Sequence, residues 1–93
     1  MSKHFAKVDK NQPEIVKELR KKGYTVQHTH EVRGFIDIIV GHEGKNYLFE
    51  IKQTAKHKLT EKETEFFNKW TGQVDIICSA QDAINIIEKS LPK

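Results

Sequence analysis

Two acids and a lysine stand at positions where they could bind a metal ion and act on a phosphate. Asp37 lies within an apolar segment, and Glu50 and Lys52 close a second apolar segment. The i, i+2 spacing puts Glu50 and Lys52 on one face of a strand. If the two segments pair, Asp37 lies beside Glu50, and adjacent carboxylates repel unless they share a proton or hold a divalent cation. The pattern predicts a metal-assisted phosphodiesterase site, with Lys52 orienting water and offsetting charge on phosphorus.

A β-hairpin would bring these side chains together. The nearly all-apolar residues 35–40 predict a strand covered on both faces, with Asp37 inside it. Glu43-Gly44 is typical of a tight turn, and residues 46–52 predict the returning strand. A buried acid needs a partner, so Asp37 is the residue that favours a functional site over an ordinary charge pair.

Helical and alternating patterns predict the rest of a small α/β domain. The expected helices span residues 11–22, 60–72 and 80–91, and the other expected strands span residues 24–29 and 74–78. The element order is then αβββαβα. Because a full helix separates the last two strands, we expect them to pair in parallel, which gives a mixed sheet with helices packed on it.

The second helix carries its own signals. Thr60 and Glu63 are spaced as a capping box at its start. Phe66, Phe67 and Trp70 follow at helical spacing. We expect them to form a buried apolar stripe, in preference to a platform on which nucleobases stack. Ser79 is the expected cap of the third helix.

Composition limits the class of protein. The chain has 93 residues, of which 37% are hydrophobic and 31% charged, which suits one small domain over residues 11–93. Residues 1–10 are interpreted as a basic flexible arm. A core this small leaves a thin margin of stability, so a homodimer is expected.

Charge and cysteine content bear on the expected partners and on the cellular compartment. The formal net charge of +3 is compatible with a polyanionic partner. The single cysteine, Cys78, excludes an intramolecular disulfide and fits the reducing cytoplasm. No apolar run is long enough for a membrane span, so no membrane association is expected.

The motif residues together resemble a nuclease superfamily. Gly34-Phe35-Ile36-Asp37 followed by Glu50-Ile51-Lys52-Gln53 is similar to the PD-(D/E)XK pattern, in particular to its VRR-NUC and Holliday junction resolvase-like members. The resemblance covers roughly residues 11–87 and includes the element order. The proline that often precedes the aspartate is Ile36 here, a change that removes no chemical group.

The resemblance implies a fold and a set of roles. The fold would be a restriction-endonuclease-like αβββαβ core with a mixed central sheet flanked by helices. Asp37 and Glu50 would bind Mg²⁺ or Mn²⁺ together with the Ile51 carbonyl, and Lys52 would be the catalytic lysine. Gln53 would be the accompanying polar residue, and Glu14 would complete the catalytic and metal site from the first helix.

Basic residues near the motif in sequence could bind the phosphate backbone of DNA. The candidate DNA-binding residues are Lys7, Lys10, Arg33, Lys56, Lys58 and Lys62. A charged, solvent-facing loop explains any one of them equally well. The position of Lys56 and Lys58, directly after Lys52, favours the functional interpretation.

Several of these residues have simpler explanations. Glu14 could be the third helical residue of a capping box with Asn11. His28 and His30 are interpreted as a solvated strand face, because no cysteines stand at zinc-site spacing. Cys78 is interpreted as a small core residue.

The sequence therefore predicts a divalent-metal-dependent endodeoxyribonuclease with structured or branched DNA as its substrate class. The alternative is a noncatalytic DNA-binding or assembly module with a nuclease-like fold. A third interpretation is a buried ion network of Asp37, Glu50 and Lys52 in a small interaction domain.

Overall fold

The computed structural model describes residues 9–56 and 58–92 of the chain. Most of the predicted basic arm, including Lys7, lies outside these described residues. Asp9 and Lys10 are described, and they immediately precede the first helix.

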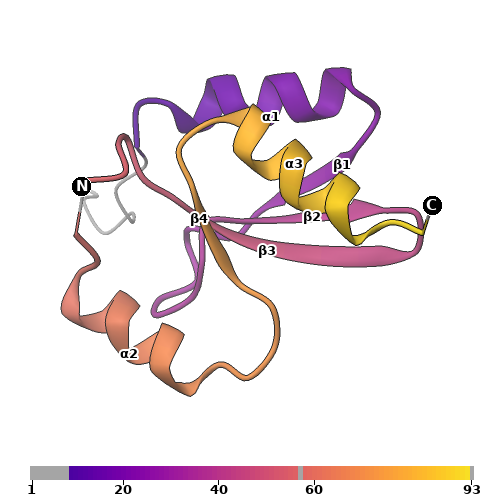
Figure 1. The fold of residues 1–93 in the computed structure, drawn as a ribbon. Helices are drawn as coiled ribbons and strands as arrows, with labels where there is room; N and C mark the ends of the chain where they lie inside the picture. The colour runs from indigo at the N-terminus through magenta and orange to yellow at the C-terminus, as the bar shows by residue number, and fades with distance from the viewer. Residues whose placement is uncertain (1–8, 57, 93) are drawn as a thin grey trace.

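The fold is α/β, with a four-stranded mixed sheet and three helices (Figure 1). The elements are α1 (Gln12–Lys21), β1 (Thr25–His28), β2 (Ile38–His42), β3 (Lys45–Ile51), α2 (Glu61–Lys69), β4 (Asp75–Ile77) and α3 (Ala80–Ser90). The strands lie in chain order across the sheet; β1, β2 and β3 pair antiparallel, and β3 pairs with β4 in parallel. The predicted element order and the parallel last pair are confirmed.

One face of the sheet carries the core. Helices α1 and α3 lie side by side over this face, whereas α2 lies on the opposite side of the sheet (Figure 1). The buried residues come from both helices and from the inward-facing positions of the strands. They include Leu19, Ile38, Val40, Phe49, Ile51, Ile77 and Ile87, none of which is exposed.

The turn between β2 and β3 is as predicted. Glu43 and Gly44 both have positive φ, at 54° and 78°. Two such residues in a row match the twist of an antiparallel pair and fix its register. In that register Ile38 lies opposite Phe49, which places Asp37 next to Glu50 at the end of the pair.

The predicted strand over residues 35–40 is wrong in its start and in its burial. β2 begins at Ile38, and Asp37 lies just before it. Thr29 holds this approach segment, since its backbone N–H donates to the Asp37 carbonyl and its hydroxyl donates to the Ile36 carbonyl. Ile39 is only half-buried, because no helix packs over its face of the sheet.

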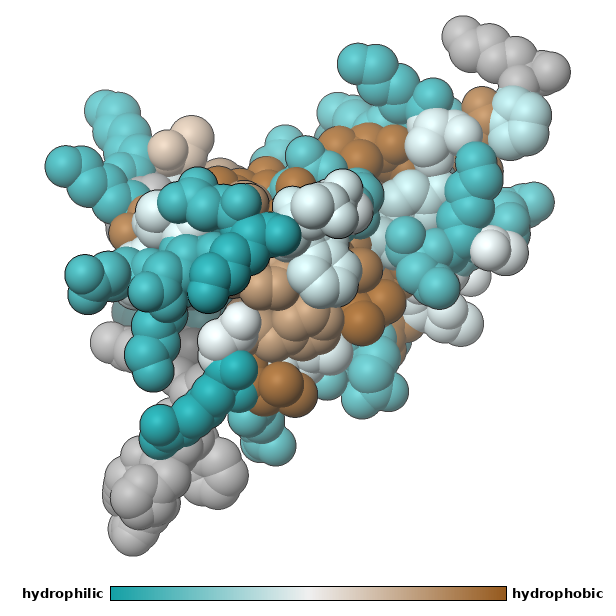
Figure 2. All heavy atoms as spheres, turned by 90° about the horizontal axis from the view of Figure 1, so that it is seen from below, coloured by the Kyte–Doolittle hydropathy of each residue, from teal (hydrophilic) through white to brown (hydrophobic). Residues whose placement is uncertain are grey.

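The face without α1 and α3 is apolar at its centre. Figure 2 shows hydrophobic side chains there, rimmed by hydrophilic ones. Leu48 is half-buried on this face, and Ile76 is 42% exposed. Alternation along β3 puts Glu50 on the same face as Leu48, so the candidate site lies on the side of the sheet that α2 approaches.

The predicted buried stripe of the second helix is wrong. α2 ends at Lys69, and none of its residues is buried. Phe66 and Phe67 are half-buried and Trp70 is 41% exposed, because α2 stands off the sheet and its aromatic side chains meet the loop before β2. Helical spacing identified the apolar side of α2 but not whether anything would cover it.

None of the three helices in the described ranges has the length and apolarity that a membrane crossing requires.

Candidate active site

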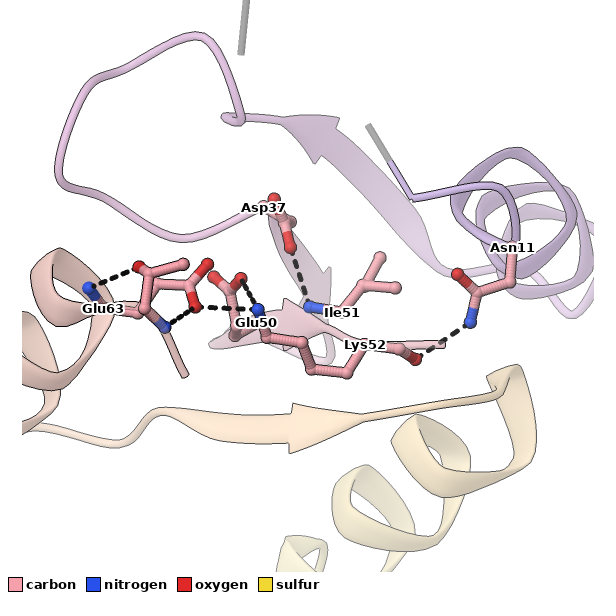
Figure 3. A network of polar contacts seen from close by, with 7 residues as sticks. Asn11, Asp37, Glu50, Ile51, Lys52 and Glu63 are labelled. Carbon is pink, nitrogen blue, oxygen red and sulfur yellow. Dashed lines mark hydrogen bonds and ion pairs between the residues drawn. The ribbon is translucent and has the colours of Figure 1, made fainter. Parts of the chain in front are cut away.

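Asp37 turns its carboxylate toward the backbone of β3. Its Oδ2 accepts a hydrogen bond from the Ile51 N–H at 2.8 Å (Figure 3). The bend before β2 permits this contact, since a strand residue would point its side chain away from the neighbouring backbone. Burial raises the pKa of Asp37, and the bond from Ile51 opposes that rise.

Glu50 is the buried acid of the site. The residue is 3% exposed and lies on β3, one position before Ile51. Burial, a hydrogen bond with Glu63 and the nearby charge of Asp37 raise its pKa to about 10. With these neighbours alone Glu50 holds a proton at neutral pH, because a second uncompensated negative charge is too costly there.

Lys52 stands beside both glutamates. Its Nζ donates to Glu63 Oε1 at 2.7 Å and lies 3.8 Å from Glu50 Oε2. The lysine side chain is only 11% exposed. Burial lowers its pKa, but the hydrogen bond and the charge of Glu63 outweigh burial, so the pKa is raised overall. Lys52 is therefore an ammonium at neutral pH.

Glu63 belongs to the site, and the sequence analysis gave it only a capping role. The capping box is present as predicted: Thr60 Oγ1 accepts from the Glu63 N–H, and Glu63 Oε1 accepts from the Thr60 N–H at 2.8 Å. The same Oε1 also accepts from Lys52 (Figure 3). Burial raises the pKa of Glu63, but hydrogen bonds from Glu50 and Lys52 outweigh it and the pKa falls. The start of α2 is thus tied to the end of β3.

Asn11 supports the site from the other side of the sheet. Its amide donates at 3.0 Å to the Lys52 carbonyl and, also at 3.0 Å, to the Cys78 carbonyl. Asn11 occupies the predicted N-cap position of α1 but makes no side-chain cap, and its NH2 group instead joins the ends of β3 and β4.

The backbone of Ile51 lies beside Asp37. The Phe49 carbonyl accepts a hydrogen bond from the Asp37 N–H, so the backbone groups of Phe49 face β2. Every second residue of β3 does the same. Ile51 is the next such residue, and its N–H already meets Asp37. By the same alternation we expect the Ile51 carbonyl to face the segment that carries Asp37, where β2 no longer pairs with β3.

A pocket of about 310 Å³ lies in front of the two acids. Asp37, Glu50 and Glu63 line it together with two basic residues, Arg33 and Lys62. The acids bind cations and the basic residues attract phosphate, so the pocket has the two kinds of charge that a metal-assisted phosphodiesterase requires.

The residues present fit a hard divalent cation. In the described parts of the chain, no group of three or more His, Cys, Asp or Glu side chains could hold a metal ion. Mg²⁺ does not need such a group, because one or two carboxylates with water and substrate phosphate suffice. The buried carboxyl group of Glu50 is the observation that favours a cation, since it shares its positive neighbour: Lys52 Nζ lies 3.8 Å from it and donates its short hydrogen bond to Glu63.

Glu14 and Gln53 are not brought to this pocket. Glu14 is exposed on the first turn of α1, and it forms no capping box with Asn11. Gln53 is exposed in the link after β3. The buried polar residue of this part of α1 is Gln12, whose amide contacts the His28 ring at 3.0 Å.

The other predicted residues fall into two groups. Of the described candidate DNA-binding residues, Arg33 and Lys62 line the pocket, and the remaining ones are exposed outside its lining. They are Lys10, Lys56 and Lys58. His30 also lines the pocket. The sequence had predicted only a solvated strand face for this residue. Cys78 is half-buried just after β4.

No protein-family model, curated protein or solved structure matches the chain.

Proposed function

We propose that the protein is a Mg²⁺- or Mn²⁺-dependent endonuclease that hydrolyses phosphodiester bonds in DNA. The carrying observation is the buried carboxylate of Glu50, held between Asp37 and the ammonium of Lys52 in a pocket lined by cationic side chains. The resemblance to the PD-(D/E)XK superfamily, with its restriction-endonuclease-like core, supports the same reaction. The four-stranded mixed sheet with helices is compatible with that core.

Asp37, Glu50 and the Ile51 carbonyl would hold the ion. When bound, it supplies a Lewis acid for the phosphoryl group and a more acidic water. Arg33 and Lys62 line the same pocket, and they would bind the phosphate oxygens of the substrate.

Lys52 acts as a cation rather than as a base in this proposal. Its raised pKa keeps all three ammonium protons at neutral pH. One bonds Glu63 and another faces Glu50, which leaves one to orient the attacking water or stabilise charge on the phosphate. Glu63 is a positioning residue, because it acts through Lys52.

A cleavage assay tests the proposal. Wild-type protein with Mg²⁺ should nick supercoiled DNA, and chelation should abolish the activity. Asp37→Ala and Lys52→Ala should each lose it while keeping the wild-type circular dichroism spectrum. Lys21→Ala, which removes an exposed lysine from α1, is the matched control and should cleave normally. Full activity in the Lys52 variant would contradict the mechanism.

The substrate and the assembly follow from the resemblance and need their own tests. A panel of single-stranded, duplex, flap and four-way DNA would identify the proposed preference for structured or branched DNA. Sedimentation of the protein with and without a four-way substrate would test the proposed homodimer. Equal cleavage of all four substrates would refute the preference, and a monomer on DNA would refute the dimer.

One observation favours a second candidate, a noncatalytic DNA-binding module whose site is a structural ion network. Lys52 already lies close to both glutamates, so part of the negative charge is balanced without an ion. This candidate predicts DNA binding that is insensitive to chelation and no Mn²⁺ binding in isothermal titration. Mn²⁺ binding that Asp37→Ala abolishes would exclude it.

A further inference from the structure

A half-open aromatic cluster lies beside the candidate active site. Phe66 and Trp70 stack with ring centroids 5.0 Å apart and planes at 24°, and Phe35 meets Phe66 edge-on. These rings join α2 to the loop before β2, yet none of the three residues is buried. Trp70 alone is 41% exposed. We call Phe35, Phe66 and Trp70 the aromatic cluster.

Basic side chains surround this cluster. A second pocket is lined by Phe66 and Trp70 together with Arg33, Lys62 and Lys69, and Glu65 is its one acid. None of the three basic residues forms an ion pair with another described residue. Their charge is therefore available to an anionic ligand, whereas a purely apolar partner would leave that charge uncompensated.

The two pockets adjoin and share part of their lining. Arg33, Gly34 and Lys62 line both the pocket at Asp37 and the pocket at Trp70. A polymer with regularly spaced negative charges could follow this path from one pocket to the other. A chain whose phosphate lay at the acids would bring its neighbouring nucleotide to the aromatic cluster.

We propose that the aromatic cluster and its basic rim bind an unpaired stretch of DNA next to the bond to be cleaved, with a nucleobase stacked on Trp70. This inference rests on the proposed function for its choice of DNA. Bases in a duplex are already covered by their neighbours, so only an unpaired base can offer a face to an aromatic ring. Aromatic rings and a basic groove are the combination by which proteins bind single strands. Such a binding site selects DNA that has an unpaired stretch next to the cleaved bond, as flaps and junctions do.

Trp70 reports on the contact directly, because it is the one tryptophan of the chain. Its fluorescence would be followed while a twelve-nucleotide single strand is added to the full chain in chelator at low salt. Stacking predicts saturable quenching. Heparin, a polyanion without bases, should leave the emission nearly unchanged, and equal quenching by heparin would overturn the stacking contact.

Substitutions then separate stacking from charge. Trp70→Ala should weaken binding of a labelled single strand by about tenfold or more, whereas Trp70→Phe should stay near wild type. Lys69→Gln should weaken binding and reduce its salt dependence, while Lys21→Gln, on α1, should do neither. Wild-type affinity in Trp70→Ala, or equal affinity for a matched duplex, would overturn the proposal. So would a protein dimer that Trp70→Ala dissociates, since the cluster would then be a self-interface.

The chelator separates this test from the proposed function. Binding through Trp70 without any cleavage in Mg²⁺ would refute the endonuclease and leave this inference standing. If the wild type cleaves DNA and the Trp70→Ala variant binds single strands normally, this inference is refuted and the proposed endonuclease stands.

Discussion

Binding of a divalent cation should release a proton from Glu50. Burial and the neighbouring carboxylates raise the pKa of Glu50 to about 10, so at pH 7 the group is almost fully protonated. Each pKa unit corresponds to about 1.4 kcal/mol, so ionising Glu50 at pH 7 costs about 4 kcal/mol that the cation must supply. A cation that binds the carboxylate therefore displaces about one proton.

Isothermal titration measures the proton directly. Mn²⁺ would be titrated at one pH in two buffers of different ionisation enthalpy, and the difference in heat gives the protons released for each ion bound. We expect about one. Across pH 7 to 9 the apparent affinity should rise about tenfold for each pH unit, since one proton competes with the ion.

Glu50→Gln serves as the matched variant, because it keeps the shape of the side chain and removes the titrating group. It should bind Mn²⁺ weakly and release no proton. Equal heats in the two buffers for the wild type, or an affinity that is flat with pH, would refute the assignment of a protonated Glu50.

Three further predictions concern the same side chains. The pKa of Glu50 is raised from 4.5 to about 10 in the folded protein, so between these pH values the folded state binds more protons than the unfolded state. The free energy of unfolding should therefore fall as pH rises, by up to about 1.4 kcal/mol per pH unit. In metal-free denaturant melts Glu50→Gln should flatten this dependence and be the more stable protein at pH 8. Glu63→Gln keeps a residue suited to the capping box but lowers the pKa of Lys52, so the loss of cleavage activity at alkaline pH should move to lower pH. Its matched variant Thr60→Ala should cost about 1 kcal/mol of stability and leave the pH profile of cleavage unchanged. Asn11→Ala leaves two backbone carbonyls without their donor and should lower the free energy of unfolding by about 1–3 kcal/mol in urea.

Local signals predicted the elements well because each has a local cause. The Glu43-Gly44 turn adopts two positive φ angles, Thr60 and Ser79 cap the helices they precede, and the apolar periods give helices and strands in the right order. The alternation of β3 also placed Glu50 and Lys52 on one face, as expected.

What the sequence did not reveal depends on contacts between distant segments. Glu63 has an evident local role as the third residue of a capping box, and nothing in its spacing reveals that Lys52 would meet it. The exposure of Trp70 has the same origin, because a helical apolar stripe looks alike whether or not another layer covers it. Glu14, by contrast, lies opposite the face formed by Ile15, Val16 and Leu19, so its exposure follows from the local helical period and not from distant contacts.

The position of Glu63 changes which charges of the site need a partner. Glu63 and Lys52 are 2.7 Å apart and neutralise each other, and their hydrogen bond fixes the ammonium at the end of β3. Asp37 and Glu50 are then left as two carboxylates without a full counter-charge, and one of them holds a proton. Exchanging that proton for a divalent ion balances the pair, whereas a monovalent ion would leave one negative charge in a buried place. The arrangement thus favours an ion of charge two at Asp37 and Glu50, and under the proposed function Lys52 would act on the substrate and the water instead of on the acids.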